Sequence, residues 1–268
     1  MLNIIIIGAG GRMGRRLVSC VANAEDMNLS GAVEYSESPF LGEDAGVIAG
    51  ISPQNIKISK NIEEFLDKSD AVIDFSTGNV VENAKKASAS GLVYVIGTTA
   101  LDEKEVGELN ILAKNGGRIV LAPNMSVGVN LLFFLTKKVA SILDDYDIEI
   151  VEMHHNKKKD APSGTAVRLG ECAAEGRNIS YQENAVHGRD GIVGSRSKNE
   201  IGMHAVRGGD VVGDHTVMFA TDGERVELTH KASSRDTFAM GALKAVRFLV
   251  GSTAGVYDMQ DVLGLKNM

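Results

Sequence analysis

The sequence predicts an α/β protein, in which a Rossmann-type, doubly wound parallel sheet is joined to an α+β domain with a mixed sheet. The chain opens on a short β-branched run that a glycine-rich turn follows at once. Up to about residue 124, apolar runs of strand length alternate with segments of helical periodicity, as in parallel sheets covered by helices. Beyond that point, short strands alternate apolar and polar residues, which is typical of a sheet with one exposed face.

The first part of the chain repeats strand and helix. Residues 2–7 (LNIIII) have the composition of a strand buried on both faces, and apolar residues then recur at helical spacing from Met13 to Val21. A second strand is expected over residues 28–33. Asp102 is expected to cap a helix. The remaining strands are expected over 71–75, 93–96 and 118–121, and the remaining helices over 80–90 and 102–115.

The pattern changes in the second part of the chain. A helix is expected over residues 129–143, where apolar residues recur three or four positions apart. Residues 147–153 alternate with a period of two, as a half-buried strand does. Further short strands are expected over 191–196, 202–207, 215–220 and 225–231, before a last helix over 236–249. These segments predict a separate domain with a mixed or antiparallel sheet and a boundary near residue 124.

Composition excludes several classes of function. The chain has 268 residues and a formal net charge of −7, which argues against non-specific binding to nucleic acid or to a membrane surface. No apolar run approaches the roughly 18 residues of a membrane span. The only two cysteines, Cys20 and Cys172, lie far apart in sequence and are expected to be free thiols in a reducing compartment. We therefore expect a cytoplasmic protein without nucleic-acid or membrane partners.

The glycine-rich turn predicts a dinucleotide site. Gly8, Gly10, Gly11 and Gly14 give the spacing G-x-G-G-x-x-G between the first strand and the first helix. Such a turn lets a pyrophosphate approach backbone N–H groups at a helix N-terminus, and Arg12 adds a cation there. The alternative is a structural turn that binds no ligand.

The end of the second strand bears on the choice of cofactor. Glu34 lies twenty residues after Gly14, where a carboxylate can hydrogen-bond the ribose hydroxyls of NAD. A 2′-phosphate needs a nearby cation, but Tyr35 follows, and Glu34 and Glu37 would repel that phosphate. We therefore expect NADH to be preferred over NADPH, unless an arginine of the first helix compensates.

Two further segments lie where predicted strands end. They are Gly97-Thr98-Thr99 and Ala122-Pro123-Asn124. Ligands of open α/β sheets bind outside the carboxyl ends of the strands, which makes both segments candidates for cofactor contact. Ordinary turn chemistry explains the same residues equally well, so both interpretations stay open here.

A basic island runs from His154 to Thr165 (HHNKKKDAPSGT) in this acidic chain. Between His154 and Arg168 there are four Lys or Arg residues and one Asp. Such a segment suits a small polyanion and can also exchange protons, although a solvated loop would explain an isolated charge run. No metal site is expected, because adjacent histidines on a strand point to opposite faces and no cysteine or third histidine lies nearby.

Together, these motifs resemble the dihydrodipicolinate reductase family, whose members are also called 4-hydroxy-tetrahydrodipicolinate reductases. The signature E-x-H-H-x-x-K-x-D-A-P-S-G-T-A occurs without a gap over residues 152–166. The other matching segments occur in the same order as in the family and span most of the chain: GAGGRMG at 8–14, DFS at 74–76, GTT at 97–99, APN at 122–124, SVGVN at 126–130 and HKASSR at 230–235.

The resemblance implies an NAD(P)H-dependent oxidoreductase that reduces 4-hydroxy-tetrahydrodipicolinate to tetrahydrodipicolinate with loss of water, in diaminopimelate and lysine biosynthesis. It implies that His154 and Lys158 are the acid/base pair. It assigns the carboxylates of this small cyclic substrate to His155, Lys158, Ser163, Gly164 and Thr165. It also implies cofactor contacts at Gly8, Ala9, Gly10, Gly11, Arg12, Met13, Gly14, Glu34, Gly97, Thr98, Thr99, Ala122, Pro123, Asn124 and Met125.

The resemblance further implies a dinucleotide-binding domain of residues 1–124 and 235–268, and a substrate-binding domain of residues 125–234 that forms a homotetramer. The chain departs from the family at Tyr35, where some members carry Arg, and at Met125, where an aromatic residue is often found. Another two-domain NAD(P)-dependent oxidoreductase would leave the basic island unexplained. An NAD-sensing regulatory protein would need no proton-transfer cluster.

Overall fold

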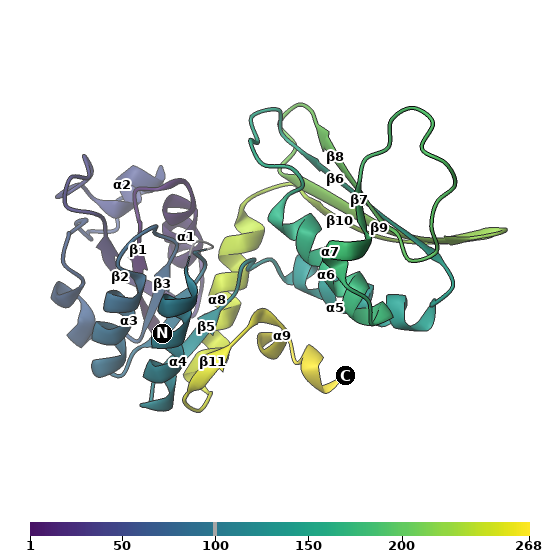
Figure 1. Cartoon of the computed structure of the whole chain (residues 1–268). Coiled ribbons are helices and arrows are strands. Elements are labelled where there is room, and N and C mark those ends of the chain that lie inside the picture. The colour runs from purple at the N-terminus through teal and green to yellow at the C-terminus, as the bar shows by residue number, and fades with distance from the viewer. Residues whose placement is uncertain (99–100) are drawn as a thin grey trace. The chain divides into compact units, whose positions relative to one another are not determined.

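The structure is a computed structural model that describes residues 1–98 and 101–268. The chain divides into two compact units (Figure 1). Unit 1 combines Met1–Val127 with Arg235–Met268, and unit 2 is Gly128–Ser234. No helix in the described part of the chain is long and apolar enough to cross a membrane.

Unit 1 is built on a six-stranded parallel sheet in the order β11-β5-β4-β3-β1-β2. Its strands are β1 (Leu2–Ile7), β2 (Met27–Val33), β3 (Ala71–Asp74), β4 (Val93–Ile96), β5 (Arg118–Leu121) and β11 (Gly255–Tyr257). The chain first adds β2 on one side of β1 and then adds β3 on the other. This reversal makes the carboxyl ends of β1 and β3 the place where open sheets of this kind bind ligands.

Helices cover both faces of this sheet. They are α1 (Arg12–Ala22), α2 (Ala45–Ala49), α3 (Val80–Ala89), α4 (Glu103–Lys114), α8 (Asp236–Val250) and α9 (Met259–Val262). Ile4 and Ile6 belong to the apolar cluster that contains residues of α1 and α8, whereas Ile5 and Ile7 belong to the one that contains residues of α3 and α4. Burial on both faces explains why β1 is apolar from Ile4 to Ile7, and it confirms the predicted doubly wound sheet.

Unit 2 contains a five-stranded mixed sheet in the order β10-β9-β6-β8-β7. Its strands are β6 (Asp147–His154), β7 (Ala185–His187), β8 (Ile201–Arg207), β9 (Gly213–Thr221) and β10 (Glu224–Ala232), and its helices are α5 (Val127–Ile142), α6 (Gly164–Arg177) and α7 (Tyr181–Asn184). Strand β6 pairs in parallel with β8 and antiparallel with β9. The prediction of a mixed-sheet architecture in this part of the chain is confirmed.

The prediction of a strand over residues 191–196 is wrong. These residues lie in a loop between β7 and β8, in which Gly188, Gly191 and Gly194 adopt positive φ. Such angles bend the chain away from the extended conformation that a strand requires. The strand that pairs with β8 at this edge of the sheet is β7, and residues 191–196 form no strand. The short elements α2 and β11 were not predicted, because segments of three to five residues show no measurable periodicity.

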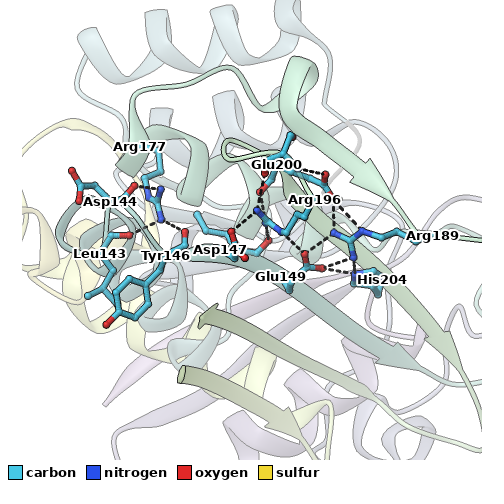
Figure 2. Close-up of polar contacts among 12 residues, drawn as sticks. Leu143, Asp144, Tyr146, Asp147, Glu149, Arg177, Arg189, Arg196, Glu200 and His204 are labelled. Atoms are coloured by element: carbon cyan, nitrogen blue, oxygen red, sulfur yellow. Dashed lines mark hydrogen bonds and ion pairs between the residues drawn. The ribbon is translucent and has the colours of Figure 1, made fainter. Parts of the chain in front are cut away.

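An ionic cluster anchors the base of this loop to the sheet (Figure 2). Glu149 of β6 accepts hydrogen bonds from Arg189 at 2.6 Å, Arg196 at 2.9 Å and His204 at 2.6 Å. Arg189 also pairs with Glu200. Burial alone would raise the pKa of Glu149, but the hydrogen bonds from the two arginines and the histidine outweigh it and lower the pKa to about 2. The cluster therefore stabilises the folded state through an ionised Glu149.

The Glu149→Gln variant is expected to lower the free energy of unfolding at pH 7 by up to about 3.5 kcal/mol, since the pKa falls from 4.5 to about 2 and one pKa unit corresponds to roughly 1.4 kcal/mol. The folded-state pKa is depressed, so this contribution is present above the unfolded value near 4.5 and is lost as the pH falls toward 2. Urea unfolding followed by circular dichroism should show that the gap between variant and wild type shrinks by about half from pH 7 to pH 3. A gap independent of pH would contradict this account, and the exposed Asp222→Asn serves as the control.

Candidate active site

The glycine turn of unit 1 brings the backbone after β1 against the start of α1. Gly8 has a φ of +76°, and the Gly11 N–H donates to the Gly8 carbonyl at 3.0 Å. Gly14 lies so close to that same carbonyl that a Cβ would overlap it. The residue before α1, Gly11, offers no side-chain cap to the first-turn N–H groups. A helix start of this kind is suited to an anion such as a pyrophosphate.

A pocket of about 870 Å³ opens beside this turn. Among the predicted cofactor residues it brings together Gly8, Gly10, Gly11 and Glu34. Glu34 is buried, and its carboxylate accepts the Gly10 N–H at 2.8 Å. The glycine turn, the uncapped helix start and this carboxylate lie on one ligand-sized pocket, so they fit the pyrophosphate and ribose of a dinucleotide.

Two more predicted residues contact the wall of this pocket. A Cβ at Gly97 would overlap the ring of Phe75, and the Thr98 hydroxyl donates to the carbonyl of Ser76. Phe75 and Ser76 both line the pocket. Thr99 lies outside the described residues. The other predicted cofactor residues do not line the pocket: Ala9, Arg12, Met13, Gly14, Ala122, Pro123, Asn124 and Met125. Of these, Ala9, Ala122 and Met125 are buried in the core of unit 1.

The pocket also contains side chains that sequence reasoning missed. Phe40 and Lys60 line it beside Tyr35 and Glu37, and Arg15 lies over the Phe40 ring at 4.9 Å. Lys60 belongs to an irregular segment after β2, for which no spacing rule relates a cation to the glycine turn. Its ammonium group is a cation on the pocket wall, and a 2′-phosphate would need such a cation to bind there.

In unit 2, strand β6 leads from the core into the basic island. Its buried face carries Ile148 and Ile150, followed by Glu152 and His154. Every second side chain of β6 points to the same buried face. The Glu152 carboxylate and the His154 imidazole therefore continue the row that Ile148 and Ile150 begin. Further along the island, Lys158 is half-buried, whereas the two lysines that flank it are exposed.

The Glu152 carboxylate is the centre of the cluster and is only 1% exposed. It accepts from His154 Nδ1 at 2.6 Å and from the Ser163 N–H at 3.0 Å. Arg207 binds both of its oxygens, at 2.8 and 2.9 Å. Burial would raise the pKa of Glu152, but these hydrogen bonds outweigh it and lower the pKa. Glu152 is therefore ionised at neutral pH.

Two histidines from neighbouring strands extend the cluster. His215 of β9 lies opposite Glu152, and its Nε2 is 3.1 Å from the Ser163 hydroxyl. Its ring meets the His154 ring edge-on at 5.2 Å between centroids. Burial lowers the pKa of His215 to about 4, so it is neutral at pH 7. His230 of β10 lies opposite His215 in the next strand.

The start of α6 completes the site. Ser163 caps this helix by accepting from the Ala166 N–H at 3.2 Å, and the space beside Gly164 is open. Lys158 Nζ lies 2.8 Å from Asp160, and His155 Nδ1 is buried without a hydrogen-bond partner among the residues described. A helix N-terminus, an ammonium group and two imidazoles thus occur in one segment. This combination can hold carboxylates and move a proton.

The sequence did not single out Glu152, Arg207 or His215. Glu152 could have been found, because it stands two residues before His154 on a strand and shares its face. Arg207 is 55 residues from Glu152, and His215 is 52 residues from Ser163. Only the pairing of β8 and β9 with β6 places these two side chains in the cluster. Among residues 1–98 and 101–268, no group of three or more His, Cys, Asp or Glu side chains is arranged to hold a metal ion.

Comparison with known proteins places the whole chain. Residues 2–125 match the family model described as "Dihydrodipicolinate reductase, N-terminus", and residues 128–263 match "Dihydrodipicolinate reductase, C-terminus". The 4-hydroxy-tetrahydrodipicolinate reductase of Syntrophotalea carbinolica is 48% identical over 268 residues, covering 99% of this chain and 100% of the relative. That of Nitrosospira multiformis is 50% identical over 268 residues, covering 99% and 98%.

A solved structure agrees with these matches. The dipicolinate-bound dihydrodipicolinate reductase from Paenisporosarcina sp. TG-14 superposes with a TM-score of 0.77 at 27% identity, covering 97% of this chain and 98% of that one. The resemblance first seen in the glycine turn and the basic island thus extends over both units. The chain belongs to the dihydrodipicolinate reductase family.

Proposed function

We propose that the protein is a 4-hydroxy-tetrahydrodipicolinate reductase. It reduces 4-hydroxy-tetrahydrodipicolinate to tetrahydrodipicolinate with loss of water, using a nicotinamide cofactor, in diaminopimelate and lysine biosynthesis. The observation that carries this proposal is the basic island. In it, the buried His154 imidazole is hydrogen-bonded to the ionised Glu152, which also binds the Ser163 N–H at the start of α6, and Lys158 belongs to the same segment. The curated relatives bear the same name, and the related Paenisporosarcina structure has dipicolinate, a ring with two carboxylates, bound.

Unit 1 is the dinucleotide-binding domain of this enzyme. Its glycine turn and the start of α1 hold the pyrophosphate, and Glu34 accepts hydrogen bonds from ribose hydroxyls. The remaining predicted contacts among the described residues, 97–98 and 122–125, follow β4 and β5 at the same edge of the sheet. A nicotinamide cofactor held by these residues would supply the hydride for the ring carbon that loses its hydroxyl group.

Unit 2 binds the substrate. Ser163, Gly164 and Thr165 present the positive end of α6 to one carboxylate of the ring. His155 and Lys158 provide donors for the other carboxylate. These groups neutralise a dianion with a helix dipole and a small number of cations, so the site needs no metal ion.

His154 and Lys158 are the acid/base pair. Reduction leaves the neighbouring ring carbon in need of a proton, and an acid at that carbon must be held within hydrogen-bond reach. His154 is fixed through Nδ1 on Glu152, which leaves Nε2 for proton exchange. Lys158 is the half-buried lysine of the three, which supports its assignment over the two exposed lysines that flank it.

We also propose that unit 2 assembles the enzyme into a homotetramer in the cytoplasm. Most side chains of β10 are exposed, and Val206 of β8 is exposed on the face of the sheet opposite to that of Glu152 and His154. A sheet face that carries exposed apolar side chains is suited to pairing with other copies of the chain. The free thiols of Cys20 and Cys172 suit a reducing compartment.

The direct test of the activity is an assay in which the product of dihydrodipicolinate synthase is supplied and the loss of NADH absorbance is followed. We expect turnover that depends on both the substrate and the cofactor. Saturable NADH binding without turnover would instead favour an NAD-sensing regulatory protein. Turnover of a sugar or of aspartate in place of this substrate would favour another two-domain dehydrogenase.

The Lys158→Ala variant is expected to lower kcat by about 10²- to 10⁴-fold, the range typical of a positioned acid or base. The Kd for NADH, measured by calorimetry, should stay near the wild-type value because Lys158 lies in unit 2. Lys157→Ala and Lys159→Ala are matched controls from the same loop, and both should retain most of the activity. Near wild-type kcat in Lys158→Ala would refute its role.

We propose that NADH is preferred over NADPH, because Glu34 and Glu37 face the same pocket as Tyr35. Steady-state kinetics should give a higher kcat/KM with NADH. Lys60 is the side chain through which NADPH would still bind, so Lys60→Ala should weaken NADPH binding by calorimetry and leave the Kd for NADH nearly unchanged. A kcat/KM several-fold higher with NADPH would overturn the proposed preference.

A further inference from the structure

We propose that Glu152 and Arg207 are positioning residues. Together they fix the tautomer of His154 and hold the Asp160 and Ser163 backbone of the basic island in place beside it. This inference rests on the proposed function, since it assigns these two residues a role in the same proton transfer. Neither residue needs to touch the substrate. Their effect is to present His154 Nε2, rather than Nδ1, to the reacting molecule.

The pairing of strands brings the groups together on one face of the sheet. Glu152 and His154 are two residues apart on β6, so their side chains share a face. Arg207 of β8 lies opposite His154, and His215 of β9 lies opposite Glu152. The carboxylate is therefore enclosed by side chains from both neighbouring strands.

The contacts of the carboxylate are divided evenly between its two oxygens. Oε2 accepts from His154 Nδ1 and from Arg207 Nη1, and Oε1 accepts from the Ser163 N–H and from Arg207 Nη2. An ionised carboxylate only accepts hydrogen bonds. His154 must therefore donate from Nδ1, and in the neutral ring Nε2 is left to accept a proton.

Arg207 extends this control to the loop that carries Lys158. Besides binding Glu152, its Nη2 donates to the Asp160 carbonyl at 2.7 Å. The side chain of Asp160 in turn pairs with Lys158 Nζ at 2.8 Å. One guanidinium group thus links Glu152 to the loop of the island, while Glu152 itself holds Ser163 at the start of α6. Both members of the acid/base pair are placed by the same ion pair.

The amide in the Glu152→Gln variant cannot reproduce these contacts. It offers one oxygen, which can keep the Ser163 N–H and one Arg207 donor, and an NH₂ group that then faces His154. Nδ1 must now accept, so the proton of the neutral ring moves to Nε2. The variant keeps the volume of the side chain but reverses the tautomer. Replacing carboxylate by amide at a histidine of this kind costs about 10⁴-fold in kcat where it has been analysed in serine proteases.

The experiment is ¹⁵N NMR of histidine-labelled full-length protein, with the His154 signals assigned through a His154→Gln variant. We expect the Nδ1–H form in the wild type and the Nε2–H form in Glu152→Gln. The kcat of the variant should fall by about 10²- to 10⁴-fold, while its Kd for NADH stays within about two-fold of the wild type. Glu25→Gln, which changes an exposed carboxyl in the turn after α1, is the control and should change neither property.

Arg207→Lys provides a second test should Glu152→Gln fail to fold. A lysine keeps the charge but loses the bidentate contact and the link to Asp160. We expect a lower kcat and a higher substrate KM with an unchanged Kd for NADH. Wild-type tautomer and wild-type kcat in Glu152→Gln, or unchanged kcat and KM in Arg207→Lys, would overturn the inference. An inactive wild type whose His154 is still in the Nδ1–H form would count against the proposed function alone.

Discussion

The site of unit 2 depends on one buried ionised carboxylate. Glu152 is 1% exposed, and an uncompensated charge at such a place would destabilise the fold by several kcal/mol. Arg207 from β8, the imidazole of His154 and the backbone N–H of Ser163 compensate it. The strand order β9-β6-β8 and the return of the chain into α6 are the geometry that supplies these donors. The same geometry fixes the imidazole, the loop of Lys158 and the N-terminus of α6, so stability and chemistry rest on the same contacts.

Unit 1 depends on a different constraint, the close approach of two backbone segments. The Gly8 carbonyl lies against Gly14, which sets α1 directly behind β1 and directs the start of the helix toward the pocket. The change in direction of strand addition at β1 then opens the pocket between the ends of β1 and β3. The proposed cofactor site thus consists mainly of backbone groups and the Glu34 carboxylate, whereas the proposed substrate site uses particular side chains.

The sequence predicts these two sites to different extents. Periodicity identifies the doubly wound sheet, and spacing identifies the glycine turn and Glu34, because these depend on residues close in the chain. The basic island is visible for the same reason. Sequence alone does not predict Arg207 or His215, because they reach Glu152 only through the register of three strands. Lys60 is missed for a similar reason. The strand expected at residues 191–196 fails because alternation does not reveal the positive φ of three glycines.

The central claim is that the basic island holds both carboxylates of a cyclic substrate around the cluster organised by Glu152. Calorimetric titration of dipicolinate, a stable cyclic dicarboxylate, into the wild type and into His155→Ala and Ser163→Ala tests it most directly. The account predicts saturable binding to the wild type, competitive with the substrate, and binding weakened by about ten-fold or more in each variant, since a lost hydrogen bond to a charged group is worth roughly 1.5–3 kcal/mol. Equal affinity in all three proteins would contradict it.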